Sequence, residues 1–207
     1  NALQKELRLD RQPRHIECFD NSNLQGAHPV ASCVVFRDGK PARKEYRHFN
    51  IKTVEGPDDY ASMREVVFRR YSRLQEEGAE LPDLIIADGG KGQMGIIHEV
   101  LEYLGLDIPV AGLAKNDRHR TSELLCGYPP VLVGIRPTSP LFHFLAHIQE
   151  EVHRFAVSFH RQKRSKAFIH SELEQIEGIG DKTIRTLLQH FRSVAKVKAA
   201  PAEELSA

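Results

Sequence analysis

The feature that most constrains the fold of this chain is a run of four apolar residues, Leu-Ile-Ile-Ala at 84–87. A strand without polar residues is covered on both faces, as at the centre of a sheet flanked by helices. Segments with a helical period precede and follow this run, at 60–78 and 92–104, and a second apolar strand is expected at 108–114. This alternation predicts an α/β fold built from βαβ units.

Three strand-like segments rich in β-branched and aromatic residues precede this alternation, at 14–20, 30–36 and 43–50. Turn-forming residues separate them, at 21–26 and at 38–41. The second of these gaps contains Asp-Gly, a favoured pair in two-residue hairpin turns. The three segments therefore predict an antiparallel meander.

The second half of the chain adds a hairpin at 121–136 and a long helix from Pro140 to about Lys166. The complete order is three strands, helix, strand, helix, strand, hairpin and helix. Three antiparallel strands that lead into βαβ units are the order of ribonuclease H-like folds, so we expect a mixed sheet flanked by helices. Residues 1–166 are predicted to form this domain.

A different pattern follows the basic stretch at 160–166. Two helical segments flank an Ile-Glu-Gly-Ile-Gly turn, and we interpret 170–207 as a small all-α helix-hairpin-helix module. Gly178 and Gly180 permit a turn that presents backbone amides at the start of a helix. Together with Lys182, these amides would bind a DNA phosphate without reading bases. The alternative is a helical hairpin used only for contact with another protein.

Composition and cysteine usage indicate a soluble intracellular protein. Apolar residues make up 41% and charged residues 28% of the chain, which is typical of a globular domain with a core. No apolar run approaches the roughly 20 residues of a membrane span, and the N-terminus lacks a signal-peptide pattern. The three cysteines have no CxxC spacing and are expected to be free thiols in a reducing compartment. We therefore expect a cytoplasmic protein without a membrane partner.

The charges are unevenly distributed along the chain, although the formal net charge is only +1. Residues 153–198 contain ten Lys and Arg against four Asp and Glu, whereas residues 1–152 contain 19 against 22. This asymmetry predicts a basic C-terminal surface beside a body rich in carboxylates.

Two aspartates stand at the ends of predicted strands. Asp20 ends the first strand, and Asp88 follows the apolar run at 84–87. Side chains at the carboxyl ends of strands in an open α/β sheet converge on a crevice, where two carboxylates could share Mg²⁺ or Mn²⁺. Such a cation could activate water and neutralise charge on a phosphodiester. The alternative is that each aspartate only caps a turn.

Histidines on the last predicted helix are further candidates. His153 could orient or deprotonate an attacking water if it lies near the two aspartates. A competing cluster of His143, His147 and Glu150 shares one helical face, a spacing compatible with zinc. However, the helical HExxH signature is absent, because Phe144 stands at the glutamate position. The residues alone leave both sites open, and also allow all of these side chains to be ordinary surface or core residues.

A glycine pattern from Gly90 to Gly95 matches the GxGxxG fingerprint of dinucleotide-binding enzymes. It does not lie in the first βαβ unit, and the preceding strand ends in Asp88, whose charge would repel a pyrophosphate. The glycines could instead let Lys91 and backbone amides approach a nucleic-acid phosphate at a helix N-terminus. A tight turn without a ligand is the third possibility.

Several longer segments together resemble one family, the C-terminal half of UvrC, which is the nuclease subunit of bacterial nucleotide excision repair. The resemblance covers nearly the whole chain and is carried, in order, by IECFDNSNLQG, VASCVVF, EYRHFNI, GPDDYASM, LIIADGGKGQ, HIQEEVHRFAVSFHRQKR and LEQIEGIGDK. It implies a ribonuclease H-like endonuclease domain joined to tandem helix-hairpin-helix motifs. The implied activity is incision of DNA on the 5′ side of a damaged nucleotide.

The resemblance also implies roles for individual residues. The aspartates of the ECFD and DGGKGQ motifs are Asp20 and Asp88, and the histidine of the E-x-x-H-x-x-A motif is His153. These three residues are implied to be catalytic and to hold Mg²⁺ or Mn²⁺, which favours His153 over the competing cluster. Asp59, in GPDDYASM, matches a further acidic position linked to activity.

The implied partner is damaged double-stranded DNA, delivered by UvrA and UvrB, and no small-molecule substrate is expected. Lys91 and Arg161 are expected to steady the DNA backbone. The chain departs from the family in showing one hairpin motif, ending at PAEELSA where a second is expected to begin. It also lacks the N-terminal half and an initiator Met, so we expect an excised fragment. A non-catalytic DNA-binding module is the main alternative function.

Overall fold

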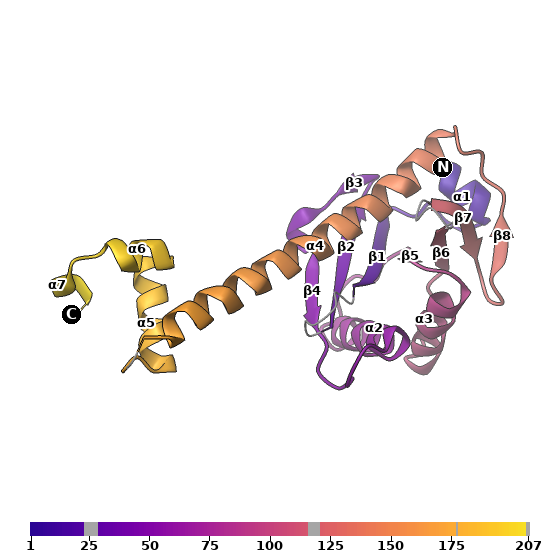
Figure 1. Cartoon of the computed structure of the whole chain (residues 1–207). Helices are drawn as coiled ribbons and strands as arrows, with labels where there is room; N and C mark the ends of the chain where they lie inside the picture. Colours follow the sequence, from indigo (N-terminus) through magenta and orange to yellow (C-terminus); the bar gives the residue numbers. More distant parts are fainter. Residues whose placement is uncertain (23–28, 116–120, 177, 206–207) are drawn as a thin grey trace. The chain divides into compact units, whose positions relative to one another are not determined.

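The computed structural model describes four stretches of the chain, at 1–22, 29–115, 121–176 and 178–205. These stretches cluster into two compact units, Asn1–Val157 and Ser158–Ala207 (Figure 1). The division lies within helix α4 (Pro140–Glu174), which also contains the end of the predicted first domain at residue 166.

The first unit is built on one mixed sheet in the order β3-β2-β1-β5-β6-β7-β8, with β4 also paired to β2. β1, β5 and β6 are parallel neighbours, and the other pairings are antiparallel. The strands are β1 (His15–Ser22), β2 (Val30–Arg37), β3 (Lys40–Pro41), β4 (Arg47–Asn50), β5 (Leu84–Ala87), β6 (Val110–Lys115), β7 (Thr121–Cys126) and β8 (Val131–Val133). The α/β fold with a mixed sheet is therefore confirmed.

Helices cover both faces of the sheet (Figure 1). One face, the α2 face, packs against α2 (Asp59–Glu76) and α3 (Lys91–Tyr103). The other, the α4 face, packs against α1 (Ala2–Leu7) and the first part of α4. The two faces have separate hydrophobic cores, so each central strand buries side chains in both directions.

Strand β5 shows why the central run contains no polar residue. Leu84 and Ile86 belong to the core under α4, whereas Ile85 and Ala87 belong to the core under α2 and α3. All four residues are fully buried. Because successive side chains of a strand point to opposite faces, both sets must be apolar when helices cover both faces. The predicted position of this run at the sheet centre is confirmed.

Local sequence signals set two of the element boundaries. The Asp58 side chain accepts a hydrogen bond from the Ala61 amide at 2.9 Å and caps the first turn of α2, as expected of an aspartate there. Asp38 and Gly39 form the turn between β2 and β3 with positive φ values of 49° and 77°. This is the conformation that makes Asp-Gly a favoured hairpin pair.

Three elements differ from expectation. The predicted strand at 43–50 is wrong in its first half, because Arg43–Glu45 forms a 3-10 turn (η1) and only Arg47–Asn50 forms β4. β3 pairs with the end of β2, and β4 pairs with the beginning of β2. The turn at Arg43–Glu45 connects these two paired segments. Helix α1 was not expected. α4 continues past Lys166 to Glu174, and no glycine or proline intervenes to stop it.

The second unit consists of the end of α4 followed by α5 (Asp181–Phe191), α6 (Val194–Ala199) and α7 (Ala202–Leu205). A small core holds these helices together and comprises Leu173, Ile184, Phe191, Val194 and Val197. Gly178 has a φ of +85°, which a residue with a side chain rarely adopts. The interpretation of this unit as a helix-hairpin-helix module stays a prediction.

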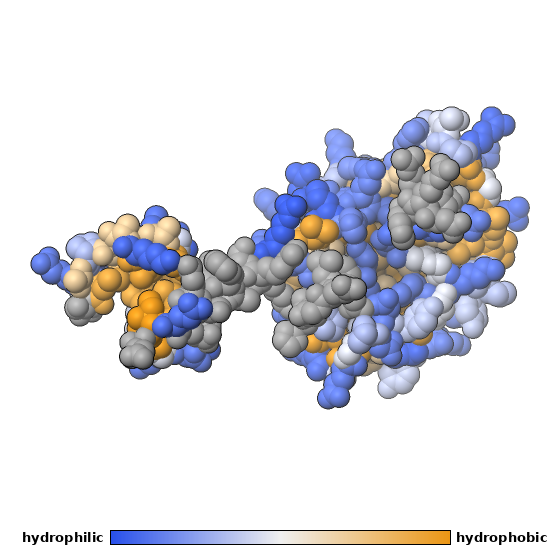
Figure 2. Space-filling model, in the orientation of Figure 1, coloured by the Kyte–Doolittle hydropathy of each residue, from blue (hydrophilic) through white to orange (hydrophobic). Residues whose placement is uncertain are grey.

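The surface of the first unit is largely hydrophilic, with hydrophobic residues gathered over β8 (Figure 2). Val131 and Leu132 of this edge strand are 63% and 58% exposed. Across the described residues, no helix combines the length and the apolar character that a membrane span requires. Cys18, Cys33 and Cys126 are free thiols, as predicted, and the first two are buried.

Candidate active site

Parallel pairing of β1 with β5 brings Asp20 and Asp88 side by side. The paired register ends at Phe19 and Ala87, so each aspartate directly follows a paired residue. The Asp88 amide donates a hydrogen bond to the Phe19 carbonyl at 2.9 Å, which continues the pairing to the end of β5. The backbone pairing therefore places the two aspartates next to each other, as the prediction requires.

Both aspartates point to the α4 face of the sheet. Cys18 and Ile86, two residues earlier on their strands, are buried in the core under α4, and side chains two residues apart share a face. Asp20 is 7% exposed, and the side chain of Asp88 is fully buried. Two carboxylates thus lie below the helix that carries the candidate histidine.

Helix α4 contributes two side chains to this pair. His153 Nδ1 lies 3.7 Å from Asp20 Oδ2, while the imidazole remains largely exposed. Gln149, one turn earlier and therefore on the same helical face, donates from Nε2 to Asp88 Oδ1. The same Nε2 also donates to the Leu113 carbonyl at 3.3 Å, which orients the amide toward the aspartate.

Strand β6 supplies a cation. Lys115 lies two residues after Leu113, a core residue of the α4 face, so its side chain reaches the same face. Lys115 Nζ is 2.8 Å from Asp88 Oδ2. Each oxygen of Asp88 therefore has a protein donor, Gln149 on one side and Lys115 on the other.

Asp20 has a different electrostatic environment. Burial and then the negative charge of Asp88 raise the pKa of Asp20 to about 6, against the smaller opposing effects of Lys115 and His153. Its Oδ2 atom is buried and accepts no hydrogen bond from the residues that the structure describes. An ionised Asp20 lacks sufficient positive charge around it, and a cation bound there would supply this charge.

The residues present fit a divalent cation with an open coordination sphere. Mg²⁺ is commonly held by one or two carboxylates together with water and substrate phosphates, so Asp20 and Asp88 are a suitable donor set. No group of three or more His, Cys, Asp or Glu side chains among the described residues is arranged to hold a metal. The predicted ligand set of Asp20, Asp88 and His153 therefore does not form a three-ligand cluster, and neither does the competing zinc set of His143, His147 and Glu150, which are exposed on α4.

Asp59, the remaining predicted catalytic residue, begins α2. Its carbonyl accepts a hydrogen bond from the Asn21 side chain at 2.7 Å, which ties the start of α2 to the residue after Asp20. The Asp59 residue is exposed. The structure thus places its backbone beside the end of β1, and a catalytic role for its carboxylate stays a prediction.

Packing explains one glycine of the pattern at 90–95. A Cβ on Gly92 would lie 2.8 Å from the ring of Tyr60, an exposed side chain at the start of α2, so the glycine leaves room for this ring. Gly90 precedes the first residue of α3, Lys91, which is exposed as a phosphate contact would require. This contact with Tyr60 gives Gly92 a local role that needs no dinucleotide.

The other predicted DNA contacts belong to the second unit. Arg161 is exposed on α4. Gly178 and Gly180 flank the turn before α5, and Lys182 is exposed in the first turn of that helix. The glycines and the lysine therefore lie around one helix start, as predicted, and their role in DNA binding stays a prediction.

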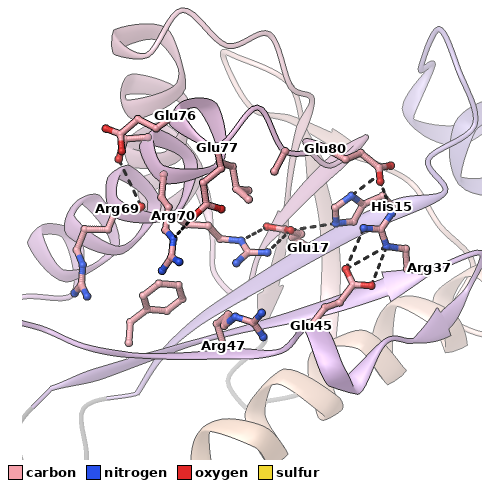
Figure 3. Close-up of a pocket in the computed structure, with 15 residues that line it drawn as sticks. His15, Glu17, Arg37, Glu45, Arg47, Arg69, Arg70, Glu76, Glu77 and Glu80 are labelled. Carbon is pink, nitrogen blue, oxygen red and sulfur yellow. Dashed lines mark hydrogen bonds and ion pairs between the residues drawn. The ribbon is translucent and has the colours of Figure 1, made fainter.

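A second charged site lies on the α2 face, toward the beginning of β1 (Figure 3). It is a cavity of about 750 Å³ whose lining includes several arginines and several glutamates. The fully buried Glu17 carboxylate accepts two hydrogen bonds from Arg70, at 2.5 and 2.6 Å, and one from the Tyr71 hydroxyl at 2.7 Å. His15 Nε2 is 3.1 Å from the same carboxylate. These contacts make Glu17 a satisfied structural charge.

Sequence reasoning missed Lys115 and Gln149. Signals for both were present in the spacing: Lys115 continues the alternation of β6, and Gln149 precedes His153 by four residues on one helix. These signals become useful only once β6 and α4 are known to lie beside Asp88. The spacing of residues within β6 or within α4 does not show this. The cavity around Glu17 was missed as well.

Comparison with known proteins identifies relatives of this chain. The family described as UvrC RNAse H endonuclease domain matches residues 4–157. The chain is 60% identical over 205 residues to UvrABC system protein C of Bacteroides fragilis, covering 99% of this chain and 34% of that protein. It is 56% identical over 204 residues to UvrABC system protein C of Streptococcus uberis, covering 98% and 34% respectively.

The chain thus spans about a third of the length of these relatives. Among solved structures, it is similar to Ciona intestinalis Endonuclease V in complex with inosine-containing DNA, with a TM-score of 0.41 and 14% identity. That likeness covers 65% of this chain and 80% of the other. The family match covers the whole sheet with both aspartates and the histidine, so the chain belongs to the UvrC RNase H endonuclease domain family.

Proposed function

We propose that this chain is the metal-dependent DNA endonuclease of nucleotide excision repair that incises on the 5′ side of a damaged nucleotide. The observation that carries the proposal is the geometry at the ends of β1 and β5. Asp20 and Asp88 are neighbours on one face of the sheet, with His153 at 3.7 Å from Asp20. Family membership supports the reaction class, and the donor set supports metal dependence.

In this proposal the two aspartates hold Mg²⁺ or Mn²⁺, which when bound supplies positive charge to the phosphodiester and to the attacking water. Asp20 offers the buried oxygen that lacks a hydrogen-bond donor. Asp88 is fixed in place by Gln149 and Lys115, so its orientation needs no rearrangement during the reaction.

His153 is the proposed acid–base residue. Its imidazole is 62% exposed on its side-chain surface, and its Nδ1 lies near Asp20. Nε2 is therefore available to a water or a DNA oxygen above the aspartates, where a general base within hydrogen-bond reach can accept a proton. The assignment of which nitrogen carries the proton belongs to this proposal.

DNA is the proposed substrate, and UvrA and UvrB are the proposed partners that deliver it. The names of the relatives place them in the UvrABC system. Lys91, Arg161 and the turn at Gly178–Gly180 with Lys182 are proposed to contact the phosphate backbone, because each presents an exposed cation or a helix start. Such binding should weaken as salt concentration rises.

The test is nicking of supercoiled plasmid DNA by the 207-residue chain with Mn²⁺ or Mg²⁺. Cutting should require the metal and fall at least about a thousandfold in Asp20→Ala, because that change removes the carboxylate with the open oxygen. His153→Ala should lose about a hundredfold or more. His143→Ala is the matched control, since it removes an exposed histidine of the same helix and should leave the rate unchanged.

Full activity of Asp20→Ala would overturn the proposed site. Loss of cutting in the His143→Ala control as well would point to damage of α4 and not to catalysis. Metal-independent DNA binding without cutting, even after addition of the missing N-terminal half and of UvrA and UvrB, would favour a non-catalytic DNA-binding module. The observation that favours this second candidate is that no three or more His, Cys, Asp or Glu side chains among the described residues form a group that could hold a metal.

A further inference from the structure

We propose that Ser32 is a positioning residue of the active site, whose buried hydroxyl donates a hydrogen bond to the Asp20 carboxylate and fixes the direction of its oxygens. This inference rests on the proposed function and adds a residue of β2 to a site otherwise built from β1, β5, β6 and α4. The observation behind it is that Ser32 Oγ and Asp20 Oδ2 are both buried without a hydrogen-bond partner among the described residues.

Ser32 is the one polar residue in the buried part of β2. The residues from Val30 to Phe36 are otherwise Val, Ala, Cys and Phe, and all of them are buried. A strand that helices cover on both faces normally contains only apolar residues, because a buried hydroxyl without a partner costs free energy. A fully buried serine on such a strand is therefore expected to have a partner on the face to which it points.

Ser32 points to the α4 face of the sheet, as Asp20 does. Val34, two residues later on β2, belongs to the core under α4, and side chains two residues apart share a face. Asp20 and Ser32 are direct partners in the antiparallel register of β1 and β2. The Cβ atoms of such partners lie about 4.5–5.5 Å apart, close enough for a hydroxyl to reach a carboxylate. Rotation of the Ser32 side chain between its staggered positions can bring the two groups together.

The two unpartnered atoms complement each other chemically. A serine hydroxyl can donate one hydrogen bond, whereas an ionised carboxylate only accepts and has about four acceptor positions on its two oxygens. One bond from Ser32 therefore fixes the Asp20 carboxylate and leaves other acceptor positions for a cation. The hydroxyl carries no net charge, so the shortage of positive charge around Asp20 remains after the bond has formed.

Asp88 already has donors that fix its direction. Lys115 Nζ bonds one of its oxygens and Gln149 Nε2 bonds the other. Both donors address Asp88, and among the described residues none reaches Asp20 Oδ2. Ser32, directly across the strand pair, gives Asp20 the kind of support that Asp88 receives from β6 and α4.

His48 lies on the other side of Ser32, where β4 pairs with β2. Its Nε2 is 3.0 Å from the Phe155 carbonyl, and its ring stacks on the Phe155 ring with the centroids 3.7 Å apart. The imidazole is thus held against α4, and the Ser32 hydroxyl has no hydrogen bond to it. Asp20 is therefore the cross-strand partner for this hydroxyl.

The first test compares the nicking of supercoiled plasmid by wild type and Ser32→Ala at saturating Mn²⁺ over a range of DNA concentrations. Ser32→Ala should lower kcat by about ten- to a hundredfold, the effect of a lost hydrogen bond to a charged group, and leave KM within about threefold. Ser32→Thr keeps a hydroxyl and should retain at least about a third of the wild-type kcat. A folded Ser32→Thr that is as slow as Ser32→Ala would overturn the inference.

Ser62→Ala is the matched control. Ser62 is also a buried serine whose Oγ is unpartnered among the described residues, but it belongs to α2, which covers the opposite face of the sheet from Asp20. Its replacement should leave the nicking rate unchanged. Equal losses in Ser62→Ala and Ser32→Ala would attribute both to disturbed packing and would count against a role for Ser32 at the site.

The second test needs neither metal nor DNA. Urea unfolding of wild type, Ser32→Ala, Asp20→Ala and the double variant forms a double-mutant cycle. Ser32→Ala should lower the folding equilibrium constant at least about fivefold in wild type, but less than about twofold beside Asp20→Ala, where the acceptor is gone. Equal losses in the two backgrounds would reject the inference, because a serine that only fills space is indifferent to Asp20. If Ser32→Ala does not fold, Ser32→Cys takes its place in both tests, since a thiol is a much weaker donor.

The two tests separate this inference from the function on which it rests. Nicking that persists in Ser32→Ala and is lost in Asp20→Ala would keep the proposed endonuclease and reject the role of Ser32. Absence of nicking by wild type would count against the proposed function. The unfolding cycle would then still decide whether Ser32 positions Asp20.

Discussion

Glu17 and Asp20 are buried carboxylates three residues apart on β1, and their surroundings are opposite. Glu17 faces α2 and receives two hydrogen bonds from Arg70 and one from the Tyr71 hydroxyl. Asp20 faces α4, next to a second carboxylate, and its Oδ2 receives no hydrogen bond from the described residues. β1 therefore carries one buried carboxylate, Glu17, whose charge is balanced by hydrogen bonds and by Arg70, and one, Asp20, whose charge is not balanced in this way.

The pKa values express this difference. Burial alone would raise the pKa of Glu17, but the hydrogen bonds from Arg70, His15 and Tyr71 together lower it to about 2. Burial and the charge of Asp88 raise the pKa of Asp20 to about 6. The comparison teaches that burial of a carboxylate does not by itself mark a functional site. A buried carboxylate with too little positive charge around it does indicate a functional site, because a bound ligand can then supply the missing charge.

The largest effect on stability should come from breaking the satisfied cluster. Glu17→Gln should lower the free energy of unfolding by about 3–5 kcal/mol, since Arg70 would remain buried without its counter-charge. Urea unfolding followed by circular dichroism at pH 7.5 measures the change. A loss below about 1 kcal/mol would show that the two carboxylates are less different than their contacts indicate.

Removal of the unsatisfied charge should act in the opposite direction. Asp20→Asn should raise the free energy of unfolding by about 3 kcal/mol at pH 8 without divalent ions, because the raised pKa means that the folded state disfavours the ionised form. The same urea titration measures the gain. Saturating Mn²⁺ should stabilise wild type but not the variant. A destabilised Asp20→Asn would contradict the comparison.

The pH dependence should separate the two residues. The penalty from Asp20 is fully present above pH 6, shrinks as the pH falls below 6, and disappears only below about pH 3.8, where folded and unfolded states both bind the proton. The gap between wild type and Asp20→Asn should therefore narrow from pH 6 and close below pH 3.8. The contribution of Glu17 persists down to its ordinary pKa near 4.5 and is lost only toward pH 2. Unfolding curves at half-unit steps of pH test both; coincident pH windows would refute the distinction.

The smallest effect is expected at the exposed rim of the Glu17 cavity. Glu80 is 66% exposed and pairs with Arg37 at 2.8 Å. Glu80→Gln should change the free energy of unfolding by less than about 1 kcal/mol, because water and salt screen such pairs. This variant is the control for Glu17→Gln, since both change a glutamate of one cavity to the same amide. Equal losses in the two variants would remove burial as the cause of the difference.

The order of strands and helices could be predicted because it depends on local periodicity. The apolar run at 84–87 predicts a buried strand from its own four residues, and Asp58 predicts the start of α2 from its own position before the helix. The strand at 43–50 was partly wrong because its first half bridges two pairings with β2, and no local pattern encodes that gap.

The candidate site divides in the same way. Asp20 and Asp88 were singled out because both stand at the carboxyl ends of predicted strands, which converge on a crevice in an open α/β sheet. Whether those two strands are neighbours was left open, and the parallel pairing of β1 with β5 decides it. His153 was preferred only through resemblance to a family. Lys115 and Gln149 were missed because their partner, Asp88, lies 27 and 61 residues away in the sequence.

By itself, the sequence determined that the strand at 84–87 is central, where α2 and α4 begin, and that Asp88 follows a buried strand. These features follow from side-chain periodicity and capping, which act over a few residues. Only the tertiary structure decided which carboxylate is compensated. The cations that matter, Arg70 for Glu17 and Lys115 for Asp88, come from other elements of the fold. Charge balance in a buried site depends on distances in space, and distances between remote residues exist only after the sheet and its helices have packed.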